Sequence, residues 1–217
     1  MEISRYLPIW NKLKKEEQEA LLEHSWEQHY EKGTLIRTGD ECTGIILIRS
    51  GQLRVYTVSE DGREITMYRL FDRDICLFTA SCMMRSIQFD MTVAAEKDTD
   101  AIVICPDVYK KIMENSAALA GYTNELMASR FSDVMWLIEQ VMWKSFDKRL
   151  ADFLLNEANI EETDTLRITH EMIGNHMGNP REVVTRMLKY FQNEGMVELS
   201  RGTVKIVDRK KLEAIAE

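Results

Sequence analysis

The sequence predicts an α+β protein with strands in its N-terminal half and helices in its C-terminal half. Between residues 26 and 105, short β-type runs are separated by glycine turns and by the hairpin dipeptide Asp61-Gly62. From Pro106 onward, apolar residues recur with helical spacing instead. Near the C-terminus, residues 168–207 are typical of two short helices followed by a hairpin.

Composition and charge restrict the classes of protein to consider. The 217 residues are 45% hydrophobic and 29% charged, and no apolar run approaches the roughly 18 residues that a membrane span needs. We therefore expect a globular protein without a membrane partner, and the charged N-terminus, which lacks an apolar signal-peptide core, indicates the cytoplasm. A net charge of −8 argues against a protein that coats nucleic acid non-specifically. Residues 166–205, however, hold six basic and four acidic side chains, so the least acidic surface is expected near the C-terminus.

The elements follow from local patterns along the chain. A short polar helix is expected around Lys15 to His24. Five β-type runs follow it, YEKGTLIRTGD, GIILIRSGQLRVYTV, EITMYRL, QFDMTVAAE and DAIVICP, which suggest a sandwich or a barrel. Pro106 suits the first position of a helix, and Ser116 can cap a much longer helix that runs to about Trp143.

The long helix carries an apolar stripe with a 4-3-4-3 alternation. Its members are Met127, Phe131, Val134, Ile138 and Val141. This spacing is typical of a coiled-coil seam, and we expect a homodimer that forms through this stripe. The alternative is that the stripe packs on the β domain of its own chain.

A change of direction is expected near Ser145-Phe146, followed by another helix and an acidic loop. The sequence therefore predicts three parts. They are an effector domain at residues 1–115, a dimerisation helix and hinge at 116–145, and a helical domain at 146–217.

The segment from Ile168 to Phe191 predicts two short helices joined by a tight turn. Thr169 can cap the first helix, and Gly178 can take the positive φ that the bend demands. Asn179 then caps the second helix, with Pro180 as its first residue and Glu182 at the third position.

The second of these helices presents a polar set that suits the major groove. The guanidinium group of an arginine can donate two hydrogen bonds to guanine, and a carboxylate can accept a hydrogen bond from cytosine. The side chain of a threonine can contact a thymine methyl group. The base-reading set is Arg181, Glu182, Thr185 and Arg186, and the expected DNA-backbone contacts are Thr169, Lys189 and Arg201. Two alternating strands around Arg201-Gly202 complete a winged helix-turn-helix. The alternative is a small α+β interaction domain that does not bind DNA.

These motifs resemble the cyclic-AMP receptor protein and fumarate–nitrate reductase regulator (Crp/Fnr) superfamily of bacterial transcription factors. The G-x-x-x-x-x-G-D pattern of Gly33 to Asp40 and the I-x-S-G-Q-L-x-V pattern of Ile48 to Val55 resemble its effector domain. The Arg181-Glu182-Val-Val-Thr-Arg motif resembles that of the cyclic-AMP branch. The resemblance implies an N-terminal β-roll of the cyclic-nucleotide-binding jelly-roll type, a long dimerisation helix and a winged helix-turn-helix. It also implies double-stranded DNA with a palindromic operator and RNA polymerase as partners.

The chain departs from the superfamily where cyclic-nucleotide-binding members hold the ribose and phosphate. Leu77-Phe78 replaces their Gly-Glu pair, and Phe89-Asp90 stands in place of their Arg-Ser pair. Burying a phosphate without its cation is costly, so we expect an effector other than cyclic AMP. Arg85-Ser86 as a displaced phosphate site is the alternative. The expected effector pocket, which favours an apolar or aromatic ligand, contains Cys76, Leu77, Phe78, Cys82 and Phe89.

The cysteines and histidines predict no metal site and no cofactor. The four Cys include no CxxC and are expected to be reduced, although Cys76 and Cys82 could instead pair or oxidise as a redox switch. The four His show no ligand spacing, and His170 and His176 are expected at the surface or in a helix cap. We expect no enzyme. The rival is a cupin-like metal-dependent enzyme or ligand-binding β-roll with a winged-helix interaction domain.

Overall fold

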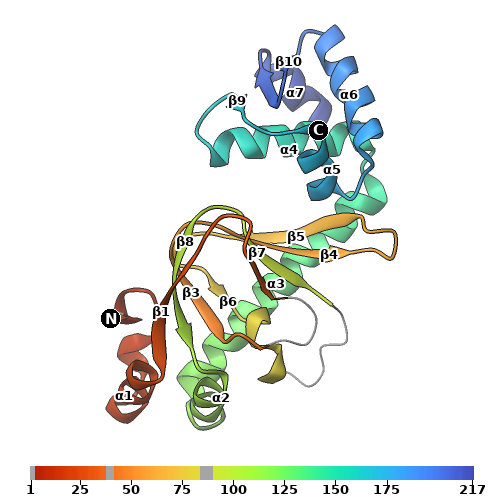
Figure 1. Ribbon diagram of the computed structural model, residues 1–217. Helices are drawn as coiled ribbons and strands as arrows, with labels where there is room; N and C mark the ends of the chain where they lie inside the picture. Colours follow the sequence, from red (N-terminus) through yellow and green to blue (C-terminus); the bar gives the residue numbers. More distant parts are fainter. Residues whose placement is uncertain (1–2, 38–41, 84–89) are drawn as a thin grey trace. The chain divides into compact units, whose positions relative to one another are not determined.

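The computed structural model describes residues 3–37, 42–83 and 90–217, the side chains of 81–83 excepted. The chain forms two compact units, one of Met1–Thr57 and Met67–Val134, the other of Val58–Thr66 and Met135–Glu217. The predicted α+β class is confirmed, with antiparallel sheets in the first unit and mainly helices in the second (Figure 1).

The described strands of the N-terminal half form two four-stranded sheets, of which the hairpin tip at Val58–Thr66 belongs to the second unit. One has the order β1-β8-β3-β6, with β1 at Ser25–Tyr30, β8 at Thr99–Ile104, β3 at Ile45–Ser50 and β6 at Ile75–Cys76. The other has the order β2-β7-β4-β5, with β2 at Leu35–Arg37, β7 at Thr92–Ala95, β4 at Leu53–Val58 and β5 at Glu64–Leu70. The predicted turn at Asp61-Gly62 connects β4 to β5, and Gly62 has a φ of 75° there.

Strand β3 has an unbroken apolar run because both of its faces are covered. Ile46 and Ile48 belong to the core between the two sheets. Ile45 and Leu47 belong to a second core, which α1 (Lys15–Glu23) and α2 (Pro106–Asn115) complete (Figure 1). Short 3-10 helices lie at Ile3–Arg5, Trp10–Lys12 and Phe78–Met83. The sandwich and both predicted helix positions are therefore confirmed.

Helix α3 is the long helix that the sequence predicts, and it spans Ala117–Trp143. Its first turns are anchored in the first unit, where Leu119 is buried and the hydroxyl groups of Tyr109 and Thr123 lie 2.9 Å apart. None of the helices in the described ranges is long and apolar enough to cross a membrane.

The second unit has the topology of a winged helix-turn-helix. Its elements are α4 at Phe146–Ile160, β9 at Thr165–Leu166, α5 at His170–Met177, α6 at Arg181–Asn193, β10 at Val197–Ser200, β11 at Thr203–Ile206 and α7 at Arg209–Ala216. The strands form one sheet in the order β10-β11-β9. Leu150 and Leu154 of α4 share one apolar core with Phe191 of α6 and Val204 of β11.

The cysteines differ from the expectation of four reduced thiols, which is wrong. Cys42 is disulfide-bonded, whereas Cys76 and Cys105 are free. A disulfide needs two cysteines that the fold brings together, and no local spacing reveals such a pair.

Candidate nucleic-acid interface

Helix α5 begins and ends as the sequence predicts. The Thr169 hydroxyl accepts a hydrogen bond of 3.1 Å from the backbone N–H of Met172, which caps the helix. At the other end, Gly178 has a φ of 69°, the left-handed conformation that lets the chain turn. A Cβ atom there would also lie 3.2 Å from the side chain of Ile65, so glycine serves both the backbone and the packing.

A second glycine, which the sequence analysis did not single out, sets the approach of the two helices. A Cβ atom on Gly174 would lie 2.6 Å from the carbonyl oxygen of Asn179. The backbone N–H of Asn179 in turn donates to the Gly174 carbonyl at 3.0 Å. Glycine at 174 therefore allows the segment that enters α6 to lie directly on α5.

The start of α6 differs by one residue from the prediction. The N-cap is Pro180, with an extended ψ of 143° and no side-chain cap bond, so the predicted cap at Asn179 is wrong. The Asn179 side-chain oxygen instead accepts a 3.4 Å hydrogen bond from Arg149 of α4. Asn179 thus links two helices, and Glu182 becomes the second residue of α6.

Helix α6 separates an apolar face from a charged one. Val184, Leu188 and Phe191 are buried in the core of the unit. The exposed charged side chains are Arg181, Glu182, Arg186 and Lys189. Within the described ranges, no hydrogen bond or ion pair to the protein engages these four side chains. Their charges are therefore available to an external partner.

Thr185, the fourth predicted base reader, is half-buried and already hydrogen-bonded. Its hydroxyl donates to the Arg181 carbonyl at 2.8 Å, and it lies 2.9 Å from Nδ1 of His170 at the start of α5. Burial lowers the pKa of His170, and the positive charges of Arg181 and Lys189 lower it further. His170 was expected at the surface, and the structure shows its side chain half-buried.

The wing follows the predicted pattern. Strands β10 and β11 pair antiparallel, with Ser200 opposite Thr203 on either side of the turn. Gly202 has a φ of 71°, and Arg201 beside it is exposed. Lys205 pairs with Glu198 at 3.1 Å on the solvent side, so Arg201 is the wing cation that stays unpaired within the described structure.

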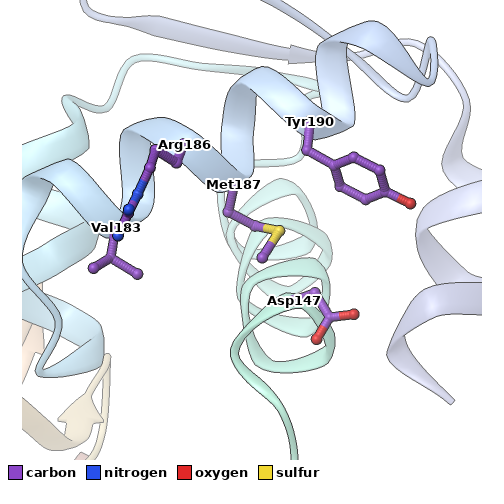
Figure 2. A pocket seen from close by; sticks show the side chains of 5 residues that line it. All are labelled: Asp147, Val183, Arg186, Met187 and Tyr190. Carbon is purple, nitrogen blue, oxygen red and sulfur yellow. The ribbon is translucent and has the colours of Figure 1, made fainter.

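An open hollow lies between α4 and α6 and has a volume of about 400 Å³ (Figure 2). Val183, Arg186, Met187 and Tyr190 of α6 line it together with Asp147 of α4. A hydrogen bond from the Ser145 side chain lowers the pKa of Asp147, which keeps this carboxylate ionised beside α6. The sequence analysis did not predict the hollow, because its sides come from separate helices.

Comparison with known proteins agrees with this architecture. A Crp-like helix-turn-helix domain matches residues 148–215, and a cyclic nucleotide-binding domain matches residues 27–116. A solved structure from Eubacterium rectale, described as a transcriptional regulator of the Crp/Fnr family, is 58% identical. The alignment covers 98% of this chain and 99% of that chain, with a TM-score of 0.96. The chain belongs to the Crp/Fnr family.

Two further Crp/Fnr relatives are more distant. The transcriptional activator protein FnrA of Stutzerimonas stutzeri is 28% identical over 194 residues, which are 84% of this chain and 77% of the relative. The cyclic AMP receptor protein of Thermus thermophilus is 24% identical over 210 residues, 96% of each chain. The protein is therefore a transcription regulator with a DNA-binding helix-turn-helix, and the regulators of this family bind DNA and act as dimers.

The five residues of the predicted Crp/Fnr dimer seam have two different environments. Met127 and Val134 are partly buried against the core of the β-roll. Phe131, Ile138 and Val141 are exposed. A line of exposed apolar side chains on α3 shares Phe131 and Ile138 with this seam and includes Met135 and Met142.

The predicted effector residues of the roll do not share one lining. Cys76 and Phe78 are buried between the two sheets, whereas Leu77 is buried in the core below α1 and α2. Burial also raises the pKa of the Cys76 thiol, which disfavours the reactive thiolate. Phe89 and the side chain of Cys82 lie outside the described residues.

A cation that the sequence analysis missed lies beside this region of the roll. Arg130 of α3 forms ion pairs with Asp133 at 2.9 Å and with Asp74 at 3.3 Å. Its guanidinium carbon lies 5.1 Å from the centre of the Tyr68 ring. Only the fold reveals this cluster, because Arg130 and Asp74 are far apart in the sequence.

No group of three or more His, Cys, Asp or Glu side chains in the described ranges is arranged to hold a metal ion. His176 is buried, where Nδ1 lies 2.8 Å from the Thr66 hydroxyl and its ring packs at 5.4 Å from that of Phe153. The prediction of a surface or cap position is therefore wrong for His176, because the side chain points into the unit.

Proposed function

We propose that the protein is a homodimeric, sequence-specific regulator in which α6 reads bases in the major groove. This proposal is carried by the observation that Arg181, Glu182 and Arg186 are exposed on α6 and form no hydrogen bond or ion pair within the described ranges. The guanidinium group of an arginine can donate hydrogen bonds to both O6 and N7 of guanine, and a carboxylate can accept a hydrogen bond from N4 of cytosine. Thr185 completes the base-reading set.

The flanking residues are assigned to the DNA backbone. Lys189 follows the base readers on the exposed side of α6, Thr169 starts α5, and Arg201 forms the tip of the wing. Side chains at these places position a protein on DNA without reading its sequence. In this proposal residues 146–217 are the DNA-binding domain, 1–115 the effector domain and 116–145 the dimerisation helix and hinge.

The proposed dimer forms through the exposed apolar side of α3. Phe131, Met135, Ile138 and Met142 recur at intervals of four, three and four residues and are 42–67% exposed. Large apolar side chains in a continuous line favour burial against a partner, and this spacing suits a second copy of the same helix. Family members act as dimers, which supports the same assignment.

We also propose that a small effector or a redox signal acts on the roll, and that the effector is not cyclic AMP. The family's Gly-Glu pair is replaced by Leu77-Phe78, of which both side chains are buried. The nearby cation Arg130 is already paired with two carboxylates, so a bound phosphate would have to compete with them. The free, buried Cys76 favours a ligand over oxidation at this residue.

The remaining assignments follow from the family. Because its relatives regulate transcription, the protein is proposed to act in the cytoplasm on double-stranded DNA, with RNA polymerase as a further partner. It is not proposed to be an enzyme.

Selection from random double-stranded DNA by the full-length protein tests the proposal. We expect enrichment of a palindrome whose half-sites carry G·C pairs at the positions that Arg181 and Arg186 reach. Recovery of unenriched DNA would contradict sequence-specific reading by α6.

A further inference from the structure

We infer that His170 is a positioning residue for base reading, because it holds the hydroxyl of Thr185 in one hydrogen-bonded orientation. The inference rests on the proposed function, since it assigns to α5 a part in what α6 reads. It also limits the kind of base edge that Thr185 can recognise.

The direction of each hydrogen bond follows from counting hydrogens. A threonine hydroxyl carries one hydrogen, and that of Thr185 is donated to the Arg181 carbonyl at 2.8 Å. At the 2.9 Å contact with His170, the hydroxyl oxygen must therefore accept, so Nδ1 of His170 carries a hydrogen. The neutral ring is then the Nδ1–H tautomer, and the protonated ring keeps the same donor.

This arrangement determines what Thr185 has left for DNA. Its only hydrogen is engaged by Arg181, and one of its two acceptor positions is engaged by His170. The methyl group and one acceptor position remain. Thr185 then suits a thymine methyl or a base amino group, and it cannot donate to the acceptors N7 and O6 of guanine.

Without His170 this restriction is relaxed. The hydroxyl of a helical threonine divides between two rotamers, because it can bond back to carbonyls of the preceding turn. Loss of the His170 donor frees the hydroxyl to turn outward and donate to a base. We therefore expect a broader preference at the base pair that Thr185 contacts.

A purely structural role of His170 would give a different result. The approach of α5 to α6 is also secured by the Gly174 contact and by the shared core that contains Ile173 and Val184. If His170 only added to this packing, its loss would lower the stability of the protein and weaken binding to every DNA sequence alike. The readout must therefore be base preference, position by position.

The experiment compares full-length wild type with the variants His170→Ala, His170→Asn and Thr185→Val, and with the double variant His170→Ala/Thr185→Val. Affinity is measured for the selected palindrome with each of the four base pairs at each half-site position. His170→Ala should change the ratio of affinities for different base pairs about two- to tenfold at one half-site position and leave the preference at the other positions unchanged. His170→Asn should restore it, because the Asn side-chain N–H replaces Nδ1–H. His29→Ala, an exposed histidine in the first unit, is the matched control.

The double variant shows whether His170 acts through Thr185. In the Thr185→Val background, His170→Ala should have no further effect on base preference. A uniform loss of affinity, or the same change with and without the Thr185 hydroxyl, would overturn the inference while leaving the proposed function intact. A wild-type protein that selects no sequence would overturn both.

Nitrogen-15 NMR of the histidine side chains gives a second test that needs no DNA. The inference requires the Nδ1–H tautomer of His170 at neutral pH. Observation of the Nε2–H tautomer would overturn it whatever the DNA experiment shows.

Discussion

The arginines of the second unit differ in whether the protein pairs their guanidinium groups. Arg209 of α7 is half-exposed, yet it forms ion pairs with Asp164 at 3.2 Å and Glu213 at 3.6 Å. Arg181 and Arg186 have no such partner in the described structure. In our proposal the same residue type therefore serves stability in α7 and base reading in α6.

Replacement of Arg181 or Arg186 by Ala should each cost roughly 1–3 kcal/mol at the selected site and relax the base preference there. The measurement is fluorescence anisotropy on the selected palindrome and on single-base variants. Lys189→Ala should instead weaken binding to all DNA sequences alike, and it should reduce the magnitude of the slope of log affinity against log salt concentration by about one. Arg209→Ala, the paired control, should leave affinity unchanged. Equal losses on specific and random DNA for Arg181→Ala would place that side chain on the backbone.

The lowered pKa of His170 predicts how its protonation affects stability. Above the unfolded-state pKa of 6.5, the ring is neutral in both states and has no effect. As the pH falls through 6.5, the unfolded chain binds the proton first, so the folded state loses stability until the pH passes the lower folded-state pKa. Urea unfolding of His170→Asn should show a shallower loss of stability with acid than the wild type. Parallel curves would contradict the lowered pKa.

At the scale of elements, α3 shows where periodicity predicts well and where it does not. The spacing of apolar residues correctly predicts a helix to Trp143. It cannot tell which apolar line faces the roll, because both lines have helical spacing. Val134 packs toward the roll, whereas Ile138 and Met142 are exposed, so the free apolar surface includes only part of the predicted seam.

The exposed apolar residues of α3 determine the best test of the dimer. Ile138→Asp/Met142→Asp should give folded monomers, since both side chains are exposed and their charges would be buried in a partner interface. Sedimentation equilibrium gives the mass, and circular dichroism checks the fold. Ser129→Asp, exposed and about 180° around the helix from Ile138, should remain dimeric. A dimer in the double variant would show that α3 is not the interface.

The helix-turn-helix was largely predictable, because its signals are local. Thr169 and Gly178 act within a few residues of their partners, and the cap and the turn are found where expected. The exact start of α6 could not be predicted, because the side chain of Asn179 forms a hydrogen bond with Arg149 of another helix. Arg130 was missed for the same reason, since its two carboxylate partners include Asp74 of a distant turn.

At the scale of the whole molecule, an effector can regulate only by binding two arrangements of the protein with different affinity. A change in DNA affinity of about 5- to 150-fold requires a difference of roughly 1–3 kcal/mol. The cation beside the expected pocket, Arg130, is already paired with two carboxylates, so the phosphate of cyclic AMP would have to compete with them. Calorimetry should therefore show no binding of cyclic AMP at micromolar concentration, and DNA affinity should not change. Tight binding would point to Arg85-Ser86 as the phosphate site.

The central claim is that two copies of α6, held by one dimer, read two half-sites on the same side of the DNA. The half-sites should lie about one helical turn, roughly 34 Å, apart. The most direct measurement is the affinity of the wild-type protein for the selected palindrome and for the same DNA with half a turn, about five base pairs, inserted between the half-sites. The account predicts that the insertion reduces affinity to that for a single half-site, because the second half-site turns to the opposite side of the duplex. Equal affinity for the two DNAs would contradict it.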